Sequence, residues 1–177
     1  MTEVFVSIGS NIQREKHITK ALRLLCIRYG HVRISSVYES EAVGFSGTPF
    51  YNLVASFHTR EPLLEIAKQL RAIEDRCGRI RNGARYSSRT MDLDLLLYGD
   101  AVVTTENIAV PRPEILTEAF VLGPLAELAG NLRHPIRQQT FQQLWAQHDA
   151  SQRRIRPVAL ALDAALPLRQ VTRECAV

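Results

Sequence analysis

Apolar and polar positions in the first hundred residues follow the two periods that separate strands from helices. Val4–Ile8 is a short β-forming run that ends at Gly9–Asn11, where we expect turn and N-cap residues. Apolar residues then recur at intervals of three and four, which predicts one buried helix face: Ile18, Ala21, Leu22, Leu25, Cys26 and Tyr29. Gly30 follows where a helix C-cap is expected.

The same two periods continue along the next part of the chain. Residues 32–38 and 51–59 are expected to form strands joined by a long, glycine-containing connection. Pro62 opens a second helix at a permitted first-turn position, and an apolar strand follows over residues 92–98. This order, strand–helix–strand–strand–helix–strand, predicts a ferredoxin-like α+β fold with helices packed on one face of an antiparallel sheet.

The remaining residues add shorter elements and a tail. Helices are expected over residues 120–129 and 141–147, and the composition changes after about Ser151. A chain of 177 residues suits one well-packed domain and is short for two. We therefore expect a single domain over residues 1–150 and a C-terminal extension over residues 151–177, partly ordered or packed on the domain.

A basic segment lies directly before the last predicted strand. It holds four arginines: Arg79, Arg81, Arg85 and Arg89. Asp92 and Asp94 follow on the strand, and residues i and i+2 of a strand share a face, roughly 6–7 Å apart. Mg²⁺ suits such a pair because it binds one or two carboxylates and completes its octahedron with water and phosphate oxygens. Since guanidinium groups bind phosphate, the pattern predicts metal-bridged polyphosphate chemistry.

Composition narrows the class of protein. The net charge is +4, whereas a general nucleic-acid binder usually has a larger, clustered basic excess. Cys26, Cys77 and Cys175 are odd in number and widely spaced, so we interpret them as free thiols of a reducing cytosol. The sequence has no signal-peptide pattern and no apolar run of the ~18–20 residues that span a membrane. We expect a cytoplasmic monomer without a membrane or nucleic-acid partner.

Several stretches together resemble one enzyme family. They are Val6–Asn11, Ser35–Tyr38, Val43–Gly44, Phe50–Asn52, Glu74, Gly78–Arg81, Arg89–Gly99, Phe120–Leu122 and Pro124–Leu128. The string Arg-Thr-x-Asp-Leu-Asp-Leu is highly specific. Over roughly residues 3–147 the chain resembles 6-hydroxymethyl-7,8-dihydropterin pyrophosphokinase of folate biosynthesis, also called 2-amino-4-hydroxy-6-hydroxymethyldihydropteridine diphosphokinase.

The resemblance implies an enzyme that transfers pyrophosphate from MgATP to the hydroxymethyl group of 6-hydroxymethyl-7,8-dihydropterin and releases AMP. It implies that Asp92 and Asp94 hold two Mg²⁺ ions bridging the phosphates of ATP, the co-substrate. The implied catalytic residues are Arg79, Arg89, Asp92 and Asp94, and the implied ATP contacts are Glu74, Arg79, Arg89 and Arg112. Catalysis of this kind rests on positioning and charge neutralisation, so no protein nucleophile is required.

The resemblance also implies a pterin pocket made of Ser40, Val43, Asn52, Tyr86 and Phe120. Asn52 would bind the amide-like edge of the pterin, because a carboxamide offers a donor and an acceptor together. Phe120 would stack on the ring, and Tyr86 stands where the family usually has a tryptophan. Ser40 and Val43 would pair with the pterin through backbone groups.

The chain departs from the family pattern at three places. Arg112 replaces the usual histidine, Glu118 replaces the usual arginine, and the loop before Thr90 lacks the usual glycine and proline. Arg112 can still contact a phosphate, whereas Glu118 would repel ATP if it faced it. These changes leave open a diverged paralogue that binds pterin or nucleotide without turnover.

The Asp-x-Asp motif and the fold, each taken alone, are also compatible with different functions. An Asp-x-Asp alternation is typical of any half-exposed strand, and of metal-dependent nucleotidyl- or glycosyltransferases, although the sequence lacks their Rossmann-type repeats. A ferredoxin-like sheet can also be an RNA-binding module. That function needs exposed aromatic residues on central strands, where this chain has Asn52, Asp92 and Asp94.

Overall fold

The computed structural model describes residues 1–42, 44, 46–80, 88–160 and 171–173, the last three by their backbone alone. Val43 and Tyr86, two of the residues expected in the pterin pocket, lie outside this part of the chain, as does Cys175.

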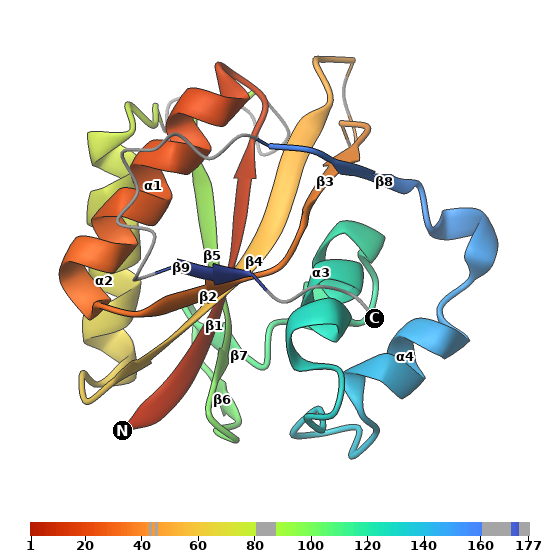
Figure 1. The fold of residues 1–177 in the computed structure, drawn as a ribbon. Helices are drawn as coiled ribbons and strands as arrows, with labels where there is room; N and C mark the ends of the chain where they lie inside the picture. Colours follow the sequence, from red (N-terminus) through yellow and green to blue (C-terminus); the bar gives the residue numbers. More distant parts are fainter. Residues whose placement is uncertain (43, 45, 81–87, 161–170, 174–177) are drawn as a thin grey trace.

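The first seven elements follow the expected order of strands and helices (Figure 1). They are β1 (Thr2–Ser10), α1 (Arg14–Tyr29), β2 (Val32–Ile34), β3 (Val37–Ser40), β4 (Phe50–Thr59), α2 (Leu63–Arg76) and β5 (Asp92–Tyr98). One predicted strand is divided into β2 and β3, because four steps from Ile34 to Tyr38 oppose only three steps of β4. At the break, the Ser35 hydroxyl accepts a hydrogen bond of 3.0 Å from the Val54 amide.

The later elements extend the sheet and cover it. They are β6 (Val103–Thr104), β7 (Ala109–Val110), η1 (Pro113–Ile115), α3 (Ala119–Ala129), α4 (Phe141–Gln147), η2 (Ala150–Gln152), β8 (Ile155–Val158) and β9 (Val171–Arg173). β6 and β7 form a small sheet of their own. β8 pairs antiparallel with β3 and β9 pairs parallel with β2, so residues near the C-terminus add strands to the main sheet.

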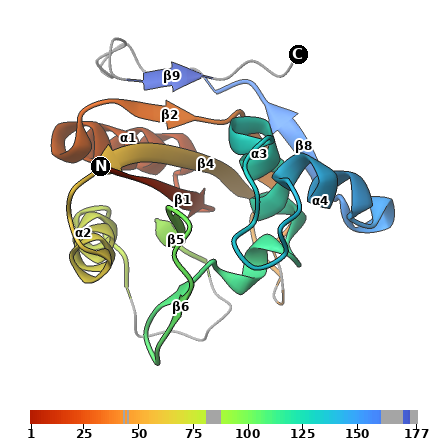
Figure 2. The ribbon, with the colours of Figure 1, turned by 90° about the horizontal axis from the view of Figure 1, so that it is seen from below.

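The main sheet has the strand order β5-β1-β4-β2, and these neighbours are antiparallel, which confirms the ferredoxin-like plan. α1 and α2 cover one face (Figure 2), against residues such as Val6 and Leu53. Side chains alternate along a strand, so Phe5, Val54 and Leu96 project to the other face, where α3 and α4 cover them. This second helical layer is an addition that the order of elements did not indicate.

α3 covers only part of the second face. Its apolar residues pack with Phe5 and Val54, whereas Gly9, Asn52 and Asp92 lie outside this apolar cluster. In Figure 1, α3 lies beside the lower part of the sheet, and the end of β1 extends above it. The end of the sheet beyond α3 is therefore available for polar side chains.

Several smaller features of the helices agree with the sequence. Gly30 follows α1 with φ 78°, a conformation that favours glycine. Cys26 and Cys77 are buried free thiols, and burial raises the pKa of both. Within the described residues, no helix has both the length and the apolar character that a membrane span requires.

Candidate active site

Three residues lie side by side across the uncovered end of the second face. Gly9 on β1 is paired with Asn52 on β4 and with Asp92 on β5. Directly opposed residues of antiparallel strands project to the same face. Neighbouring strands are ~4.8 Å apart, so the backbones of Asn52 and Asp92 are about 10 Å apart. Gly9 has no side chain and places no bulk between the carboxamide and the carboxylate.

The second carboxylate lies further along β5. Asp94 is paired with Ser7, two residues before Gly9, so it projects to the same face as Asp92. The two side chains are partly exposed, 23% for Asp92 and 34% for Asp94. Leu93, between them, is buried against the other face. The expected shared face of the two aspartates is confirmed.

Three arginines are paired with these carboxylates. Nη1 of Arg79 lies 3.2 Å from Oδ1 of Asp92, and Nη1 of Arg89 bonds to Oδ2 of the same side chain. Nη2 of Arg112 lies 3.1 Å from Oδ1 of Asp94. The arginines that were expected at ATP phosphates therefore surround both aspartates, and their charges reduce the repulsion within the pair.

The surroundings of Asp94 oppose its ionisation. Partial burial raises the pKa of Asp94 above its ordinary value, and the charge of Asp92 raises it further. Arg112 acts in the opposite direction. A nearby cation favours the ionised form of a carboxyl group, so a divalent cation here would stabilise both carboxylates.

The donor atoms suit a hard cation. Within the described residues, no cluster of three or more His, Cys, Asp or Glu side chains could enclose a metal ion. Asp92 and Asp94 offer oxygen ligands alone. Such a site fits Mg²⁺, which keeps several waters and takes its remaining ligands from substrate phosphates.

Glu74 supports β5 from the side of α2. Its side chain is buried, and Oε1 accepts a hydrogen bond of 2.9 Å from the amide of Leu93. Leu93 lies between the two aspartates on β5, which is an edge strand of the main sheet. Glu74 was expected near the nucleotide. The structure shows it holding the strand that carries the aspartates.

Ser10 and Asn11 connect the end of β1 to the residues before β5. Oδ1 of Asn11 accepts a hydrogen bond of 2.6 Å from the amide of Arg89, and Nδ2 donates to the carbonyl of Thr48 at 3.1 Å. The Ser10 hydroxyl donates to the carbonyl of Thr90 at 2.7 Å. These contacts fix the backbone of Arg89 beside Asp92.

The expected N-cap role of these two residues is wrong. α1 begins after Gln13, which has φ 45° and makes no side-chain cap bond. Short polar side chains at a strand end bond equally well to nearby or distant backbone groups. The only signal in the sequence for these contacts is that Ser10 and Asn11 directly follow the first predicted strand.

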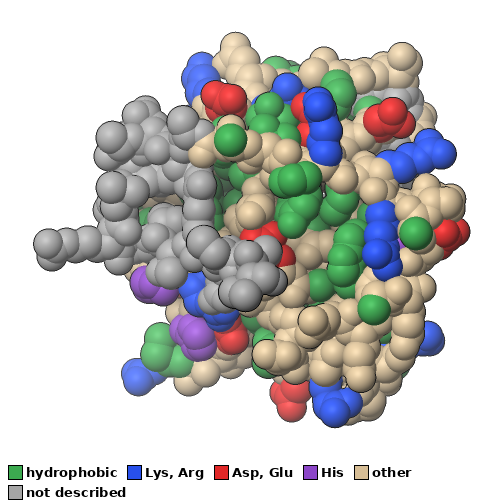
Figure 3. All heavy atoms as spheres, turned by 45° about the vertical axis from the view of Figure 1, so that its right-hand side comes forward, with side chains coloured by type: hydrophobic (Ala, Val, Ile, Leu, Met, Phe, Trp, Pro, Cys, Tyr) green, Lys and Arg blue, Asp and Glu red, His purple; other side chains and the backbone are tan. Residues whose placement is uncertain are grey.

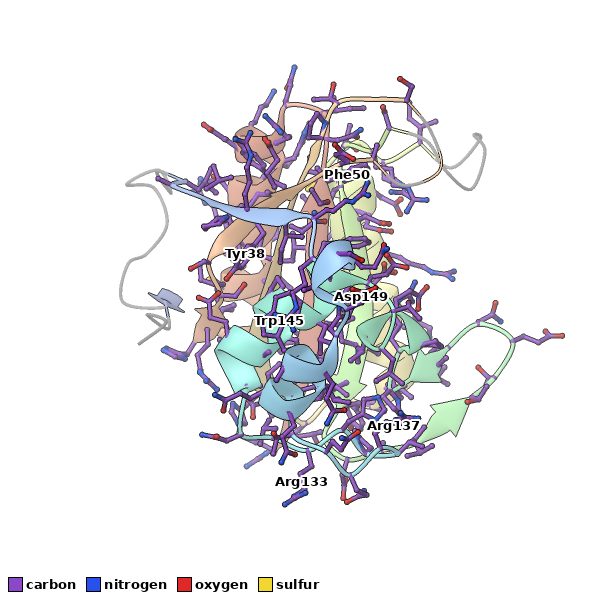
Figure 4. All side chains as sticks on the ribbon, turned by 90° about the vertical axis from the view of Figure 1, so that its right-hand side faces the viewer. Tyr38, Phe50, Arg133, Arg137, Trp145 and Asp149 are labelled. Atoms are coloured by element: carbon purple, nitrogen blue, oxygen red, sulfur yellow. The ribbon has the colours of Figure 1, made fainter. Side chains whose placement is uncertain are left out.

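Two predicted pterin residues lie on the other side of Gly9 from the aspartates. Nδ2 of Asn52 donates a hydrogen bond of 2.9 Å to Oγ of Ser40, which fixes the direction of the buried carboxamide. Ser40 is paired with Phe50 across β3 and β4. Figure 4 shows Phe50 at the upper end of the sheet. Ser40 and Asn52 therefore form one polar unit at the ends of neighbouring strands.

A cavity of about 640 Å³ lies beside this unit. Ser40 and Phe120 both line it, so another predicted pterin residue is brought to the same place. Glu118 lines it as well, and the Thr117 hydroxyl donates to its Oε1 at 3.3 Å. Residues beyond α3 complete the lining: Gln147, His148, Asp149, Gln152, Arg154 and Ile155. This half-open pocket is large enough to admit a small heterocyclic ligand.

The chain matches a family model over most of its length. The model describes 7,8-dihydro-6-hydroxymethylpterin-pyrophosphokinase (HPPK) and matches residues 5–130. The matched part contains Gly9, Asn52, Asp92 and Asp94 and ends before α4 and the C-terminal strands.

Two bacterial proteins named 2-amino-4-hydroxy-6-hydroxymethyldihydropteridine pyrophosphokinase are among its relatives. The Bacillus subtilis protein is 34% identical over 131 residues, covering 70% of this chain and 76% of that protein. The Pseudomonas aeruginosa protein is 36% identical over 136 residues, covering 75% and 83%. A folic acid synthesis protein of Pneumocystis carinii is 34% identical over 136 residues, which are 75% of this chain but 18% of the longer protein.

Solved structures share the fold. The crystal structure of wild-type Plasmodium falciparum HPPK-DHPS aligns with 82% of this chain and 44% of that chain, with a TM-score of 0.66 and 13% identity. At this identity the likeness concerns the fold alone. The match to the family model and the identity with bacterial relatives of similar length show that this chain belongs to the HPPK family.

Proposed function

We propose that this chain transfers a pyrophosphoryl group from MgATP to 6-hydroxymethyl-7,8-dihydropterin at the strip formed by Asn52, Gly9 and Asp92. The family supplies the reaction, and the register of three strands is the observation that carries its assignment to these residues. It sets a carboxamide suited to a pterin edge about 10 Å from a carboxylate suited to Mg²⁺. A pterin held by Asn52 can then extend its hydroxymethyl group toward phosphates held near Asp92.

Asp92 and Asp94 would hold two Mg²⁺ ions together with the ATP phosphates. The ions would neutralise phosphate charge and keep the triphosphate in place. In the structure the same carboxylates are paired with Arg79, Arg89 and Arg112. Guanidinium groups bind carboxylate and phosphate in the same forked geometry. The three arginines would therefore exchange a carboxylate partner for a phosphate partner when MgATP binds.

The transfer itself needs no protein nucleophile. The pterin hydroxyl oxygen bonds to the β-phosphorus and loses its proton to solvent, the bond from this phosphorus to the oxygen that bridges it to the α-phosphate breaks, and AMP leaves. The protein contributes orientation and charge. Asn52 and Phe120 would orient the pterin, while Arg79 and Arg89 would stabilise the negative charge that spreads over the phosphates.

The two unusual residues are compatible with turnover. Arg112 lies 3.1 Å from Asp94 and places a permanent positive charge where the family usually has a histidine. Glu118 lines the cavity beside Phe120, on the side assigned to the pterin. These positions favour an active enzyme over a paralogue without turnover.

The face of the molecule shown in Figure 3 does not support an RNA-binding function. On the face in Figure 3, the described Lys and Arg side chains are interspersed with Asp and Glu and form no continuous basic band. The strands at the site carry Asn52, Asp92 and Asp94 in place of the exposed aromatic residues that RNA-binding sheets of this kind use.

We also propose a catalytic domain over residues 1–150 with a C-terminal extension over residues 151–177, acting as a monomer in the cytoplasm. The two buried thiols Cys26 and Cys77 support a reducing compartment. Size-exclusion chromatography with light scattering tests the monomer, and a dimer mass would contradict it.

The reaction is tested by incubating the protein with ATP, Mg²⁺ and hydroxymethyl-dihydropterin and measuring AMP. AMP is expected only when all three are present. Reactions without pterin control for ATP hydrolysis, and reactions with EDTA control for the metal. Binding of ATP and pterin without formation of AMP would support the non-catalytic paralogue instead.

A further inference from the structure

The part of the chain beyond the family match reaches the pterin side of the site. The match ends at residue 130, yet β8 pairs with β3 and sets Ile155 opposite Ser40 and Arg156 opposite Glu39 (Figure 1). Six residues between positions 147 and 155 also line the cavity with Phe120: Gln147, His148, Asp149, Gln152, Arg154 and Ile155. In Figure 4, Asp149, which precedes η2, lies below Phe50.

Glu39 joins β8 to two other parts of the fold. Nε of Arg156 donates to Oε1 of Glu39 at 2.8 Å, and Nη1 of Arg14 donates to Oε2 at 2.9 Å. Arg14 also donates to the carbonyl of Pro49 at 2.9 Å, and its guanidinium carbon lies 3.8 Å above the centre of the Tyr51 ring. We call Arg14, Glu39, Tyr51 and Arg156 the Glu39 clamp.

The Glu39 carboxyl group, at the centre of the Glu39 clamp, is largely buried and paired with both arginines. The Glu39 side chain is only 13% exposed, and hydrogen bonding to Arg156 lowers the pKa of this carboxyl group. Arg14 reaches Glu39 at the end of β3 and the carbonyl of Pro49 just before β4. The clamp therefore ties together both ends of the connection between β3 and β4.

The clamp lies directly behind the pterin residues. Glu39 is paired with Tyr51, and Ser40 is paired with Phe50. Successive residues of a strand point to opposite faces, so Glu39 and Tyr51 project away from the face that carries Ser40 and Asn52. The clamp can therefore reach the pterin only through the backbones of β3 and β4.

We propose that Glu39 is a positioning residue for the pterin, and that the C-terminal strand β8 anchors it through Arg156. This inference rests on the proposed function. The hydrogen bond between Asn52 and Ser40 depends on the relative placement of β3 and β4, which their backbone pairing sets and the clamp supports from the opposite face. The residues assigned to ATP lie instead on β5 and its neighbours. Weakening the clamp therefore impairs pterin binding and leaves ATP binding unchanged.

The test compares Arg156→Ala and Glu39→Gln with the wild type, and uses Arg23→Ala, an exposed arginine on α1, as a matched control. An exposed ion pair changes an equilibrium constant by up to about fivefold. The pterin KM of Arg156→Ala should therefore rise by up to about fivefold. Glu39→Gln should have a larger effect because it weakens both guanidinium contacts. The ATP KM and the control variant should stay at wild-type values.

Thermal unfolding accompanies the kinetics and identifies a general loss of structure. An unchanged pterin KM in both clamp variants, or an equal rise of both KM values, overturns the inference. A wild-type protein that forms no AMP overturns the proposed function instead. In that case pterin titrations in the presence of Mg²⁺ and a non-hydrolysable ATP analogue, followed by pterin fluorescence, still compare the variants.

Discussion

Replacing Gly9 by alanine tests the centre of the proposed site. The new methyl group would lie 3.1 Å from Oδ1 of Asn52, 3.8 Å from Cδ1 of Phe50 and 4.0 Å from Cβ of Asp92. The first distance is shorter than an ordinary contact of about 3.5 Å. The carboxamide must therefore move by a few tenths of an ångström. Its hydrogen bond to Ser40 at 2.9 Å opposes this movement.

The added methyl group of Gly9→Ala should lower both the stability of the protein and its affinity for the pterin. Overpacking of this kind costs about 1–3 kcal/mol. Gly9 lies in an extended strand without a positive φ, so alanine recovers about 0.4–1 kcal/mol by restricting the unfolded chain. A net loss of at most about 2.5 kcal/mol lowers Tm by at most about 5–10 °C for a chain of this size. Displacement of Asn52 should raise the pterin KM about tenfold, which corresponds to ~1.4 kcal/mol.

The assay is steady-state AMP formation, first with pterin varied at saturating ATP and then with ATP varied at saturating pterin. Gly9→Ala should raise the pterin KM and leave the ATP KM near the wild-type value. Gly9→Ser adds one more atom at the same place and should have a larger effect. A wild-type pterin KM in both variants would refute the placement of the pterin beside Asn52 and Gly9.

Three further predictions concern the two aspartates, the two unusual residues Arg112 and Glu118, and Glu74. Asp92→Asn or Asp94→Asn should lower kcat at least ~100-fold with little change in Tm, and wild-type turnover would reject the metal assignment. Calorimetry should show weaker nucleotide binding for Arg112→Ala and level or stronger binding for Glu118→Gln, and the opposite ranking would show that both residues are misplaced. Glu74→Ala leaves a buried amide without its acceptor and should cost about 1–3 kcal/mol of stability, whereas Glu74→Gln keeps an acceptor oxygen. Equal urea midpoints for the two Glu74 variants would contradict this role.

Features that depend on local periodicity could be predicted from the sequence. The alternation around Leu93 placed Asp92 and Asp94 on one face, because a strand has a period of two whatever its partners are. The 3.6-residue period likewise predicted α1 and α2. The resemblance to a family added Asn52 as an expected pterin contact, which no local pattern indicates.

Features that depend on distant pairing could not be predicted in this way. The alignment of Gly9 with Asn52 and Asp92 follows from the register of three strands, and register is set by the whole packed sheet. Asn11 was misassigned as a cap because its partners, such as Arg89, are 78 positions away. Local patterns likewise could not predict the pairing of Ile155 with Ser40, which joins β8 to β3 across a long stretch of sequence.

The central claim is that a pyrophosphoryl group moves intact from ATP to the pterin at the aspartates of β5. Phosphorus-31 NMR of a reaction with ATP, Mg²⁺ and hydroxymethyl-dihydropterin tests it most directly. The expected products are AMP and a pterin diphosphate in equal amounts, formed by the wild type and at least ~100-fold more slowly by Asp92→Asn. ADP with a pterin monophosphate, or AMP with free pyrophosphate and unchanged pterin, would contradict the claim.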